Sequence, residues 1–300
     1  LYRNDNIELP VLQPWVCISK SSSNRLRFKR NAFFHRIDPQ GQQLPYVDEF
    51  IFGIASNKLI SAKTGTGEVD LQARYLRFDD YTFLKKGEDR SPYSTRLWTT
   101  AKGSHLALFP NLNHNNKLLR SIMQDVRFRR ALSMAVNRYE INQVIYYGLA
   151  IEGNNTVLPE SPLYKPYYRS QWAQLNLKSA NQLLDDMGLI KRDSRGIRLL
   201  PDGNPLNLII ETAGESTEQT DILELIHDSW LKIGIKIYSK PSQRNVFRNR
   251  IFSGETAISI WSGIENGLAS ANSSPAEFAP TTQQLLQWPK WGQHFETGGK

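Results

Sequence analysis

The stretch that decides the fold is DVRFRRALSMAVNRYEINQVIYYG, residues 125–148, in which basic residues precede an apolar and aromatic run. At 100° per residue, several apolar side chains fall on the same arc as Phe128, which predicts a helix with one buried face. That arc holds Phe128, Ala131, Leu132, Ala135 and Val136. Arg127, Arg129 and Arg130 lie outside it, so the pattern favours a solvated arginine shoulder beside a core-facing helix.

Asn137 divides this stretch into two predicted helices. Its side chain can accept a hydrogen bond from the first turn of a following helix, and Glu140 stands three residues later, as in a capping box. We therefore expect one helix to end before Asn137 and a second to carry the apolar residues between Ile141 and Tyr147.

The composition is that of a globular protein with more than one core. The chain has 300 residues, of which 40% are hydrophobic and 11% aromatic, enough for two domains with sizeable cores. The mean hydropathy of -0.47 and the lack of a long apolar run argue against a membrane-spanning helix. Cys17 is the only cysteine, which excludes an intrachain disulfide and a thiolate zinc site. The abrupt beginning and end of the sequence suggest a piece of a longer chain.

The chain is basic, with a formal net charge of +8 and an isoelectric point near 9.5. Such a charge is compatible with binding to a polyanion, so a nucleic-acid-binding protein is one alternative at this point. Against it, the arginines of residues 125–148 belong to a helix whose apolar arc must be buried. The charge also mildly favours neutral or acidic solutes over cationic ones.

The order of predicted elements is that of an α/β protein. Strands and short helices alternate up to Pro110, with a strand expected within DEFIFGIAS, residues 48–56. After Asn111 the helices become longer, and apolar strands are expected at 206–212, 235–240 and 256–263.

Two later segments lack regular periodicity. The proline-rich TVLPESPLYKPYY, residues 156–168, predicts a rigid surface loop that carries aromatic side chains. Everything after Gly267 is likewise expected to be loop.

No catalytic or metal-ligating pattern occurs in the sequence. The five histidines are scattered, and none stands at ligand spacing from another histidine or from Cys17. No glycine-rich phosphate loop opens a helix, and no nucleophile elbow is present. The single S-x-x-K pattern, Ser229 to Lys232, lies within an amphipathic helix, where chance explains it. We therefore expect no catalytic residue, no metal and no cofactor, while a hydrolase whose triad forms only in space stays open as an alternative.

Several motifs, in order, resemble the bacterial extracellular solute-binding proteins of family 5, the peptide-type receptors of ABC importers. The first two are similar to motifs of that family's first lobe, and the others to the crossover and helices of its second lobe. They are RNAFFHRIDPQGQQLPYVDEF at 30–50, GEVDLQ at 67–72, FPNLNH at 109–114, the block at 125–148, and LLDDMGL with HDSWLKIGIKI at 183–189 and 227–237.

This resemblance implies a two-lobe periplasmic-binding-protein fold of class II, peptide-binding cluster, an α/β fold with mixed sheets flanked by helices and an incomplete first lobe. Residues 1–110 would form part of lobe I and residues 111–300 lobe II. The implied function is capture of an oligopeptide or oligosaccharide-like solute between the lobes and its delivery to an ABC permease in the membrane. The protein would be exported to the periplasm or cell surface of a bacterium, would be monomeric and would bind no nucleic acid. A piece with half of the cleft wall missing is expected to bind ligand weakly or not at all.

The resemblance also implies where the ligand binds. Peptide receptors of the family bind the ligand's amino group through an Asp shortly after a Trp, and IWSGIENGL, residues 260–268, offers Trp261 and, offset by one residue, Glu265. Trp261 would stack on a sugar face or an apolar side chain, while Glu265 and Asn266 would bind a polar end. The complete expected site is Trp261, Ser262, Glu265, Asn266, Asn113, Tyr147 and Ser161.

The offset of Glu265 leaves the ligand open among peptides, oligosaccharides, opine-like conjugates and metal chelates. A solute-sensing module fused to a regulator is the other alternative within this class of proteins.

Overall fold

The computed structural model describes residues 7–19 and 24–299. The chain divides into two compact units, Leu1–Thr95 and Arg96–Lys300, and each is described here by itself. Residues 1–6 and Lys300, the abrupt ends noted in the sequence, lie outside the described residues.

The expected lobe boundary after Pro110 differs from the boundary between these compact units. Strand β4, Ala107–Pro110, belongs to the second unit because it pairs along its length with β7, Ile258–Trp261. The segment before β4 also belongs to that unit, since Gly103 and Ser104 exchange backbone hydrogen bonds with the chain after β7.

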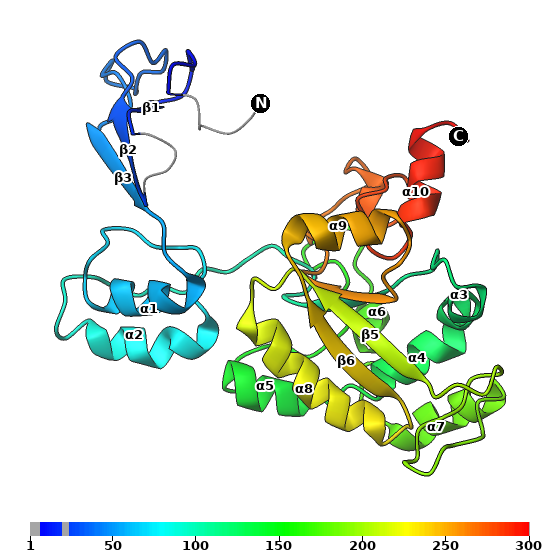
Figure 1. The fold of residues 1–300 in the computed structure, drawn as a ribbon. Coiled ribbons are helices and arrows are strands. Elements are labelled where there is room, and N and C mark those ends of the chain that lie inside the picture. Colours follow the sequence, from blue (N-terminus) through cyan, green and yellow to red (C-terminus); the bar gives the residue numbers. More distant parts are fainter. Residues whose placement is uncertain (1–6, 20–23, 300) are drawn as a thin grey trace. The chain divides into compact units, whose positions relative to one another are not determined.

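The first unit contains an antiparallel sheet of three strands in the order β1-β2-β3 (Figure 1). The strands are β1 Trp15–Cys17, β2 Arg25–Arg30 and β3 Glu49–Gly53. Phe28 lies opposite Phe50 in the ladder, and their rings are 6.0 Å apart. The strand predicted within residues 48–56 is therefore confirmed.

Short helices follow this sheet in the first unit. They are α1 Asn57–Gly65, the 3-10 turn η1 Phe78–Asp80, and α2 Tyr81–Gly87. Leu84 of α2 is buried, and the Tyr93 hydroxyl donates a hydrogen bond of 2.6 Å to its carbonyl oxygen. The expected alternation of strand and helix is wrong for this part of the chain, because three strands come first and the helices then follow one another with no strand between α1 and α2.

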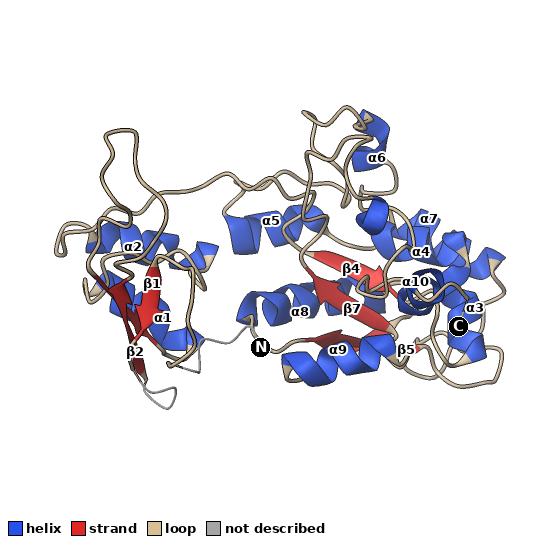
Figure 2. Ribbon diagram, turned by 90° about the horizontal axis from the view of Figure 1, so that it is seen from above, coloured by secondary structure: helices blue, strands red, loops and turns tan. Residues whose placement is uncertain are grey.

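The second unit is built on a mixed sheet of four strands in the order β4-β7-β5-β6. Its remaining strands are β5 Asn207–Thr212 and β6 Lys236–Pro241. β5 runs parallel to both β6 and β7, whereas β4 is antiparallel to β7. Figure 2 shows β4, β7 and β5 side by side.

Two helices cross over between the parallel strands. α8, Thr217–Leu231, joins β5 to β6, and α9, Arg244–Phe252, joins β6 to β7. Because β6 and β7 flank β5 on opposite sides, right-handed crossovers place the two helices on opposite faces of the sheet. Figure 1 shows this arrangement, and the two faces accordingly carry separate apolar clusters.

Most of the other helices cover the face that carries α8. They and the remaining short elements are α3 Lys117–Gln124, α4 Val126–Met134, α5 Arg138–Tyr146, α6 Pro166–Ser170, α7 Leu177–Asp186, η2 Pro275–Glu277 and α10 Pro289–Glu296. The larger core includes Phe128, Leu208 and Trp230, all nearly inaccessible to solvent. Burying each such side chain contributes about 1.5–3 kcal/mol. None of the helices within residues 7–19 and 24–299 is both long and apolar enough to cross a membrane.

The block at 125–148 folds as its pattern predicts. α4 ends before Asn137, whose side-chain oxygen accepts the Glu140 amide at 3.2 Å and so begins α5. The three arginines bind groups within their own unit, as an arginine shoulder would. Arg127 pairs with Asp125, Arg129 donates to the carbonyl oxygens of Met123 and Gln124, and Arg130 lies over the Trp172 ring.

Two loop predictions are wrong in part. α10 forms after Gly267, where only loop was expected. Pro289 fits the first turn of this helix, and Gly292 interrupts the apolar period that would have predicted it. The proline-rich segment is irregular at first, but Pro166 begins α6 in the same way and carries the last three residues of the segment into a helix. A proline is unfavourable inside a helix, but Pro166 and Pro289 each stand at the start of one.

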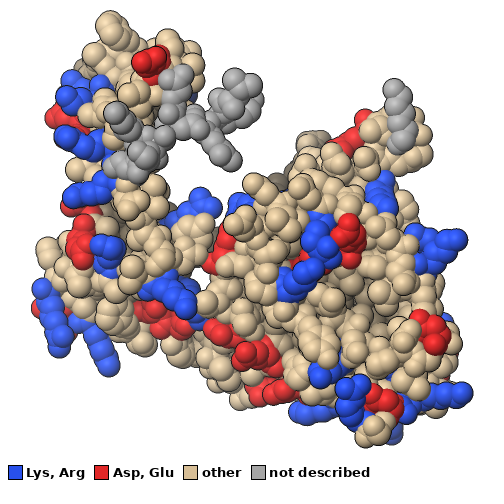
Figure 3. Space-filling view, in the orientation of Figure 1, with Lys and Arg blue, Asp and Glu red and all other residues tan. Residues whose placement is uncertain are grey.

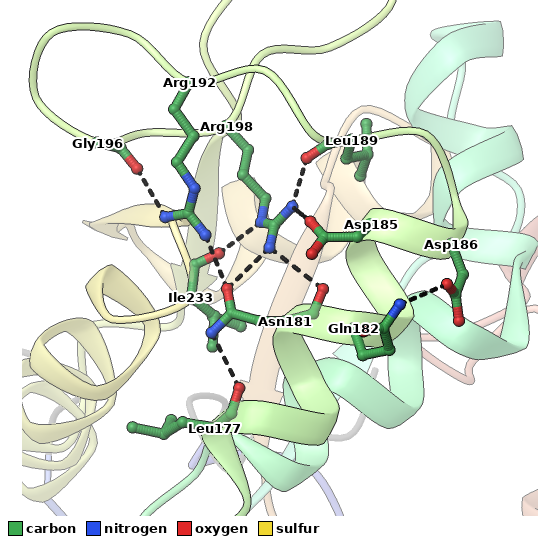
Figure 4. A network of polar contacts seen from close by, with 10 residues as sticks. All are labelled: Leu177, Asn181, Gln182, Asp185, Asp186, Leu189, Arg192, Gly196, Arg198 and Ile233. Atoms are coloured by element: carbon green, nitrogen blue, oxygen red, sulfur yellow. Dashed lines mark hydrogen bonds and ion pairs between the residues drawn. The ribbon is translucent and has the colours of Figure 1, made fainter.

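A buried polar network holds the end of the α7 region to the core (Figure 4). The guanidinium of Arg198, whose side chain is 1% exposed, pairs with Asp185 at 2.5 Å and binds the Asn181 side chain at 2.8 Å. It also donates to the backbone carbonyl oxygens of Leu189 and Ile233. Because these donors and acceptors satisfy one another, a charge can be buried at this position.

Candidate functional site

The carboxyl edge of the second sheet brings four of the seven candidate residues together. β5, β6 and β7 all end at this edge, and β4 begins there because Ala107 pairs with Trp261. Loops after parallel strands commonly form ligand sites in α/β proteins, since they converge there from several strands. Trp261, Ser262, Glu265 and Asn266 all lie on the chain that leaves β7 at this edge.

Backbone pairing fixes the loop that follows β7. Gly263 donates to the Ser104 carbonyl oxygen at 3.0 Å, and Gly103 donates to that of Ile264 at 2.8 Å. A Cβ on Gly263 would stand 2.2 Å from Oδ1 of Asn155, the same oxygen that accepts the Ile264 amide. The glycine therefore allows three segments to approach closely, which holds the candidate loop in one conformation.

The carboxylate of Glu265 is already engaged within the unit. Ser262 donates a hydrogen bond of 2.6 Å to it, and the Lys102 ammonium lies 3.0 Å away. Burial would raise the pKa of Glu265, but the Ser262 hydrogen bond and Lys102 together bring this pKa below its ordinary value. Glu265 is therefore ionised at neutral pH, with its charge balanced by Lys102.

A second carboxylate, from a residue later in the sequence, binds the same loop. Glu277 accepts the backbone amides of Glu265 at 2.7 Å and of Asn266 at 3.3 Å. The Asn266 side chain in turn accepts the amide of Leu268 at 3.2 Å. Glu277 and Asn266 thus shape the loop, in addition to any contact that Asn266 makes with a solute.

The ring of Trp261 is flanked by an aromatic and two cationic side chains of α9. Phe247 stacks at 6.0 Å between ring centres, with 28° between the ring planes. The guanidinium carbon of Arg244 lies 5.2 Å from the centre of the ring, and that of Arg248 lies 5.8 Å away. Both distances are within the range of cation-π attraction. Trp261 thus packs against the small core on the α9 face and also contacts two charged side chains.

The two arginines differ in their partners. Arg244 forms a two-pronged ion pair with Glu215, which follows β5, at 2.7 and 2.5 Å. Arg248 donates to the Gln284 carbonyl oxygen at 3.1 Å. Burial lowers the pKa of Arg248, and the neighbouring Arg244 charge lowers it further. Figure 3 shows basic and acidic side chains side by side on the surface over α9.

A further polar group lies where α5 ends beside the first turn of α8. The Tyr146 hydroxyl donates to Glu218 at 2.6 Å, and His105 Nε2 lies 3.2 Å from the same carboxylate. The hydrogen bond to Glu218 raises the pKa of His105, against the opposing effects of burial and Lys102. Tyr147, an expected site residue, comes next in the chain with a φ of 53°, and its side chain is 46% exposed.

Two other expected site residues have structural contacts. The buried Ser161 hydroxyl donates to the Ala269 carbonyl oxygen, so it fastens the proline-rich segment to the chain after β7. Asn113 is also buried and lies beyond Pro110, at the opposite edge of the sheet from Trp261. Its side chain accepts the Trp291 amide at 3.1 Å at the start of α10.

The sequence expectations did not include Lys102, Glu277, Arg244 and Arg248. Lys102 and Glu277 reach the loop after β7 only through the tertiary fold, and no local pattern marks them. The two arginines did carry a signal, since their spacing of four residues places both on one side of a helix, close to the apolar Phe247.

The assembled edge can hold a polar solute by ion pairs, hydrogen bonds and stacking. It presents an indole ring, two guanidinium groups, an ammonium and several carboxylates within one unit. Within the described ranges, no three His, Cys, Asp or Glu side chains lie close enough together to hold a metal ion.

In the first unit, a pocket of about 230 Å³ beside the sheet is lined by Gln13, Pro14, Trp15, Phe28 and Phe50.

Known proteins are similar to this chain in sequence and in fold. The chain is 26% identical to a probable ABC transporter-binding protein of Deinococcus radiodurans over 71% of its own length and 36% of the relative's. It is 31% identical to the solved oligopeptide-binding protein OppA, with a TM-score of 0.56, over 88% of this chain and 42% of that one. The chain therefore spans less than half the length of these relatives.

A more distant structure superimposes better. The periplasmic binding protein MelB of Agrobacterium fabrum C58, solved with stachyose, gives a TM-score of 0.76 at 17% identity, over 96% of this chain and 44% of that one. This likeness shows the fold, that of the class II periplasmic binding proteins of the peptide-binding cluster. A family model, Bacterial extracellular solute-binding proteins, family 5 Middle, matches residues 5–284, so the chain belongs to that family of bacterial extracellular solute-binding proteins.

Proposed function

We propose that this chain is part of the substrate-binding component of a bacterial ABC importer. The component captures an oligopeptide or oligosaccharide-like solute in a cleft between two lobes and delivers it to the permease. The observation that carries this proposal is the family match over residues 5–284, which spans both compact units. Residues 1–110 contribute to lobe I and residues 111–300 to lobe II in this proposal.

The carboxyl edge of the second sheet supplies the solute-binding groups. Trp261 offers a ring for stacking, while Ser262, Glu265 and Asn266 stand on a loop that backbone hydrogen bonds hold in place. A preorganised loop reduces the entropy that is lost when a solute binds. Tyr147 and Ser161 belong to the proposed binding surface, and Ser161 acts by fixing the loop. Asn113 is proposed to act through the fold, because it caps α10 at the far edge.

Both ligand classes have precedents among the similar structures, since OppA is an oligopeptide-binding protein and MelB was solved with the sugar stachyose. A carboxylate without a cation partner would attract the ammonium group of a peptide. Glu265 attracts it less, because the Lys102 ammonium already lies 3.0 Å from its carboxylate. A peptide ammonium would have to compete with Lys102 for it.

The remaining features of the proposed component follow from its role. It is exported to the periplasm or cell surface, works as a monomer, catalyses no reaction and binds no nucleic acid. The contacts of the arginines in residues 125–130 support this last point, since each guanidinium is bound within its own unit. Steeply salt-dependent binding to DNA would contradict it.

The test uses the full-length protein, purified without removal of bound solute. Native mass spectrometry should show a bound small molecule, and a mass ladder in amino-acid or hexose steps would name its class. Titration calorimetry with the released solute then measures affinity. Trp261→Ala and Glu265→Gln should each weaken binding, whereas Arg195→Gln, at an exposed turn, should not. A protein that carries no solute and binds no peptide or sugar would contradict the proposal.

A further inference from the structure

The least expected feature of the carboxyl edge is its pair of arginines on α9. Arg244 and Arg248 stand one helical turn apart with both guanidinium groups near the Trp261 ring. Like charges four residues apart destabilise a helix, and a cation in the first turn also opposes the helix dipole. The local sequence therefore disfavours this arrangement unless an anion offsets it.

Only one of these two cations has a carboxylate partner. Glu215 binds Arg244 through both of its oxygens, whereas no ion pair involves Arg248 within residues 7–19 and 24–299. Arg248 uses one nitrogen for the Gln284 carbonyl oxygen, although a guanidinium has five N–H donors. A partly buried cation without a counterion costs free energy, so an anion bound at Arg248 would be stabilised.

The other carboxylates at this edge of the sheet are bound to other groups. Glu277 accepts the backbone amides of Glu265 and Asn266. Glu265 is balanced by Lys102 at 3.0 Å. Glu211, at the end of β5, is buried and is bound on both oxygens by Arg250, at 2.7 and 2.9 Å. Among the described residues, none of these carboxylates pairs with Arg248, which lies beside an aromatic ring at the edge where α/β sheets bind ligands.

We propose that Arg248 binds a carboxylate of the transported solute, and that the part of the solute next to this carboxylate packs against Trp261. The inference rests on the proposed function and narrows it to acidic solutes. The free C-terminus of a peptide and the acid group of a uronic sugar share this chemistry. A guanidinium matches either carboxylate with two parallel N–H donors.

The test compares acidic solutes with neutral partners of the same shape on the full-length protein. One pair is trialanine and trialanine amide, and the other is trigalacturonate and neutral galactotriose, each measured by titration calorimetry. We expect the acid of at least one pair to bind about tenfold or more tightly than its neutral partner, with the preference falling as salt is raised. Which pair shows the preference identifies the source of the carboxylate.

Arg248→Gln keeps a donor for Gln284 and should abolish the preference, and Arg248→Lys should leave part of it. Arg195→Gln removes an exposed arginine elsewhere and should leave the preference intact. Unfolding curves of each variant show that the fold is retained. Equal binding of acid and neutral partner, tighter binding of the neutral partner, or a preference that persists in Arg248→Gln would overturn the inference while the transport function stands. Binding of none of the four solutes, with no co-purified acid, overturns the inference, and the proposed function falls with it only if no other solute binds.

Discussion

Arg198 and Arg248 lie in the same unit but in opposite electrostatic settings. Arg198 is 1% exposed and binds a carboxylate, a side-chain amide and backbone carbonyl oxygens, as Figure 4 shows. Arg248 is partly buried beside a second arginine and binds a single carbonyl oxygen. A satisfied cation of the first kind stabilises the fold, whereas an unsatisfied one of the second kind is suited to binding an anion.

The largest expected effect separates these two settings by stability. Arg198→Met should lower the free energy of unfolding by about 3 kcal/mol or more, because buried carbonyl oxygens lose their donors and Asp185 loses its partner. Arg195→Met, whose side chain is 60% exposed and pairs with Asp193, should cost less than about 1 kcal/mol. Urea unfolding of the full-length protein measures both. Equal losses for the two variants would show that the Arg198 network adds nothing beyond a surface ion pair.

The sequence predicted the helices of the second unit better than the contacts within its candidate site. The apolar period of α4 and the capping pair at Asn137 and Glu140 are local, so they identified elements that the structure confirms. The carboxylate of Glu265, by contrast, meets Lys102 across 163 positions of sequence. No period or spacing encodes such a contact, because the antiparallel pairing of β4 with β7 creates it.

The same limit applies to the expected site residues. Trp261 and Glu265 were placed by a motif, and the structure brings them to one edge of the sheet. Asn113 stands in the sequence next to a crossover, but its edge depends on the antiparallel direction of β4, which periodicity does not reveal. α10 was missed because Gly292 and two aromatic residues obscure its apolar face.

The second prediction concerns the rigidity that the carboxyl edge needs if its cations are to bind a solute. Gly263→Ala places a Cβ 2.2 Å from Asn155 Oδ1, so the loop after β7 must move. We expect a loss of about 1–3 kcal/mol in stability and weaker solute binding. Gly53→Ala is the matched control, because nothing lies within 4 Å of its added Cβ. Unfolding curves and calorimetry of both variants provide the measurement, and unchanged binding in Gly263→Ala would mean that the solute does not contact this loop.

The third prediction tests the contrast by increasing the positive charge around Arg248. Glu215→Gln removes the carboxylate that binds Arg244 and makes the edge more positive by one charge. The affinity for the preferred acidic solute should rise about threefold to tenfold at low salt and return toward the wild-type value at high salt. Asp193→Asn removes a similar surface carboxylate from Arg195 and should leave the affinity unchanged. A weaker acid affinity in Glu215→Gln would place the carboxylate away from this pair of arginines.

The smallest expected effect comes from a cation whose charge depends on pH. The Glu218 hydrogen bond raises the pKa of His105 above 6.5, while burial and Lys102 oppose this, and Tyr146 shares the same carboxylate. The pair with Glu218 therefore stabilises the protein below the ordinary histidine pKa, and this contribution is lost as pH rises through the raised pKa. His105 is mostly exposed, so the effect should stay below about 1 kcal/mol. Relative to His105→Gln, the wild type should be more stable at pH 5.5 than at pH 8.5 in urea unfolding, and an equal difference at both values would show that the pair gives no pH-dependent stability.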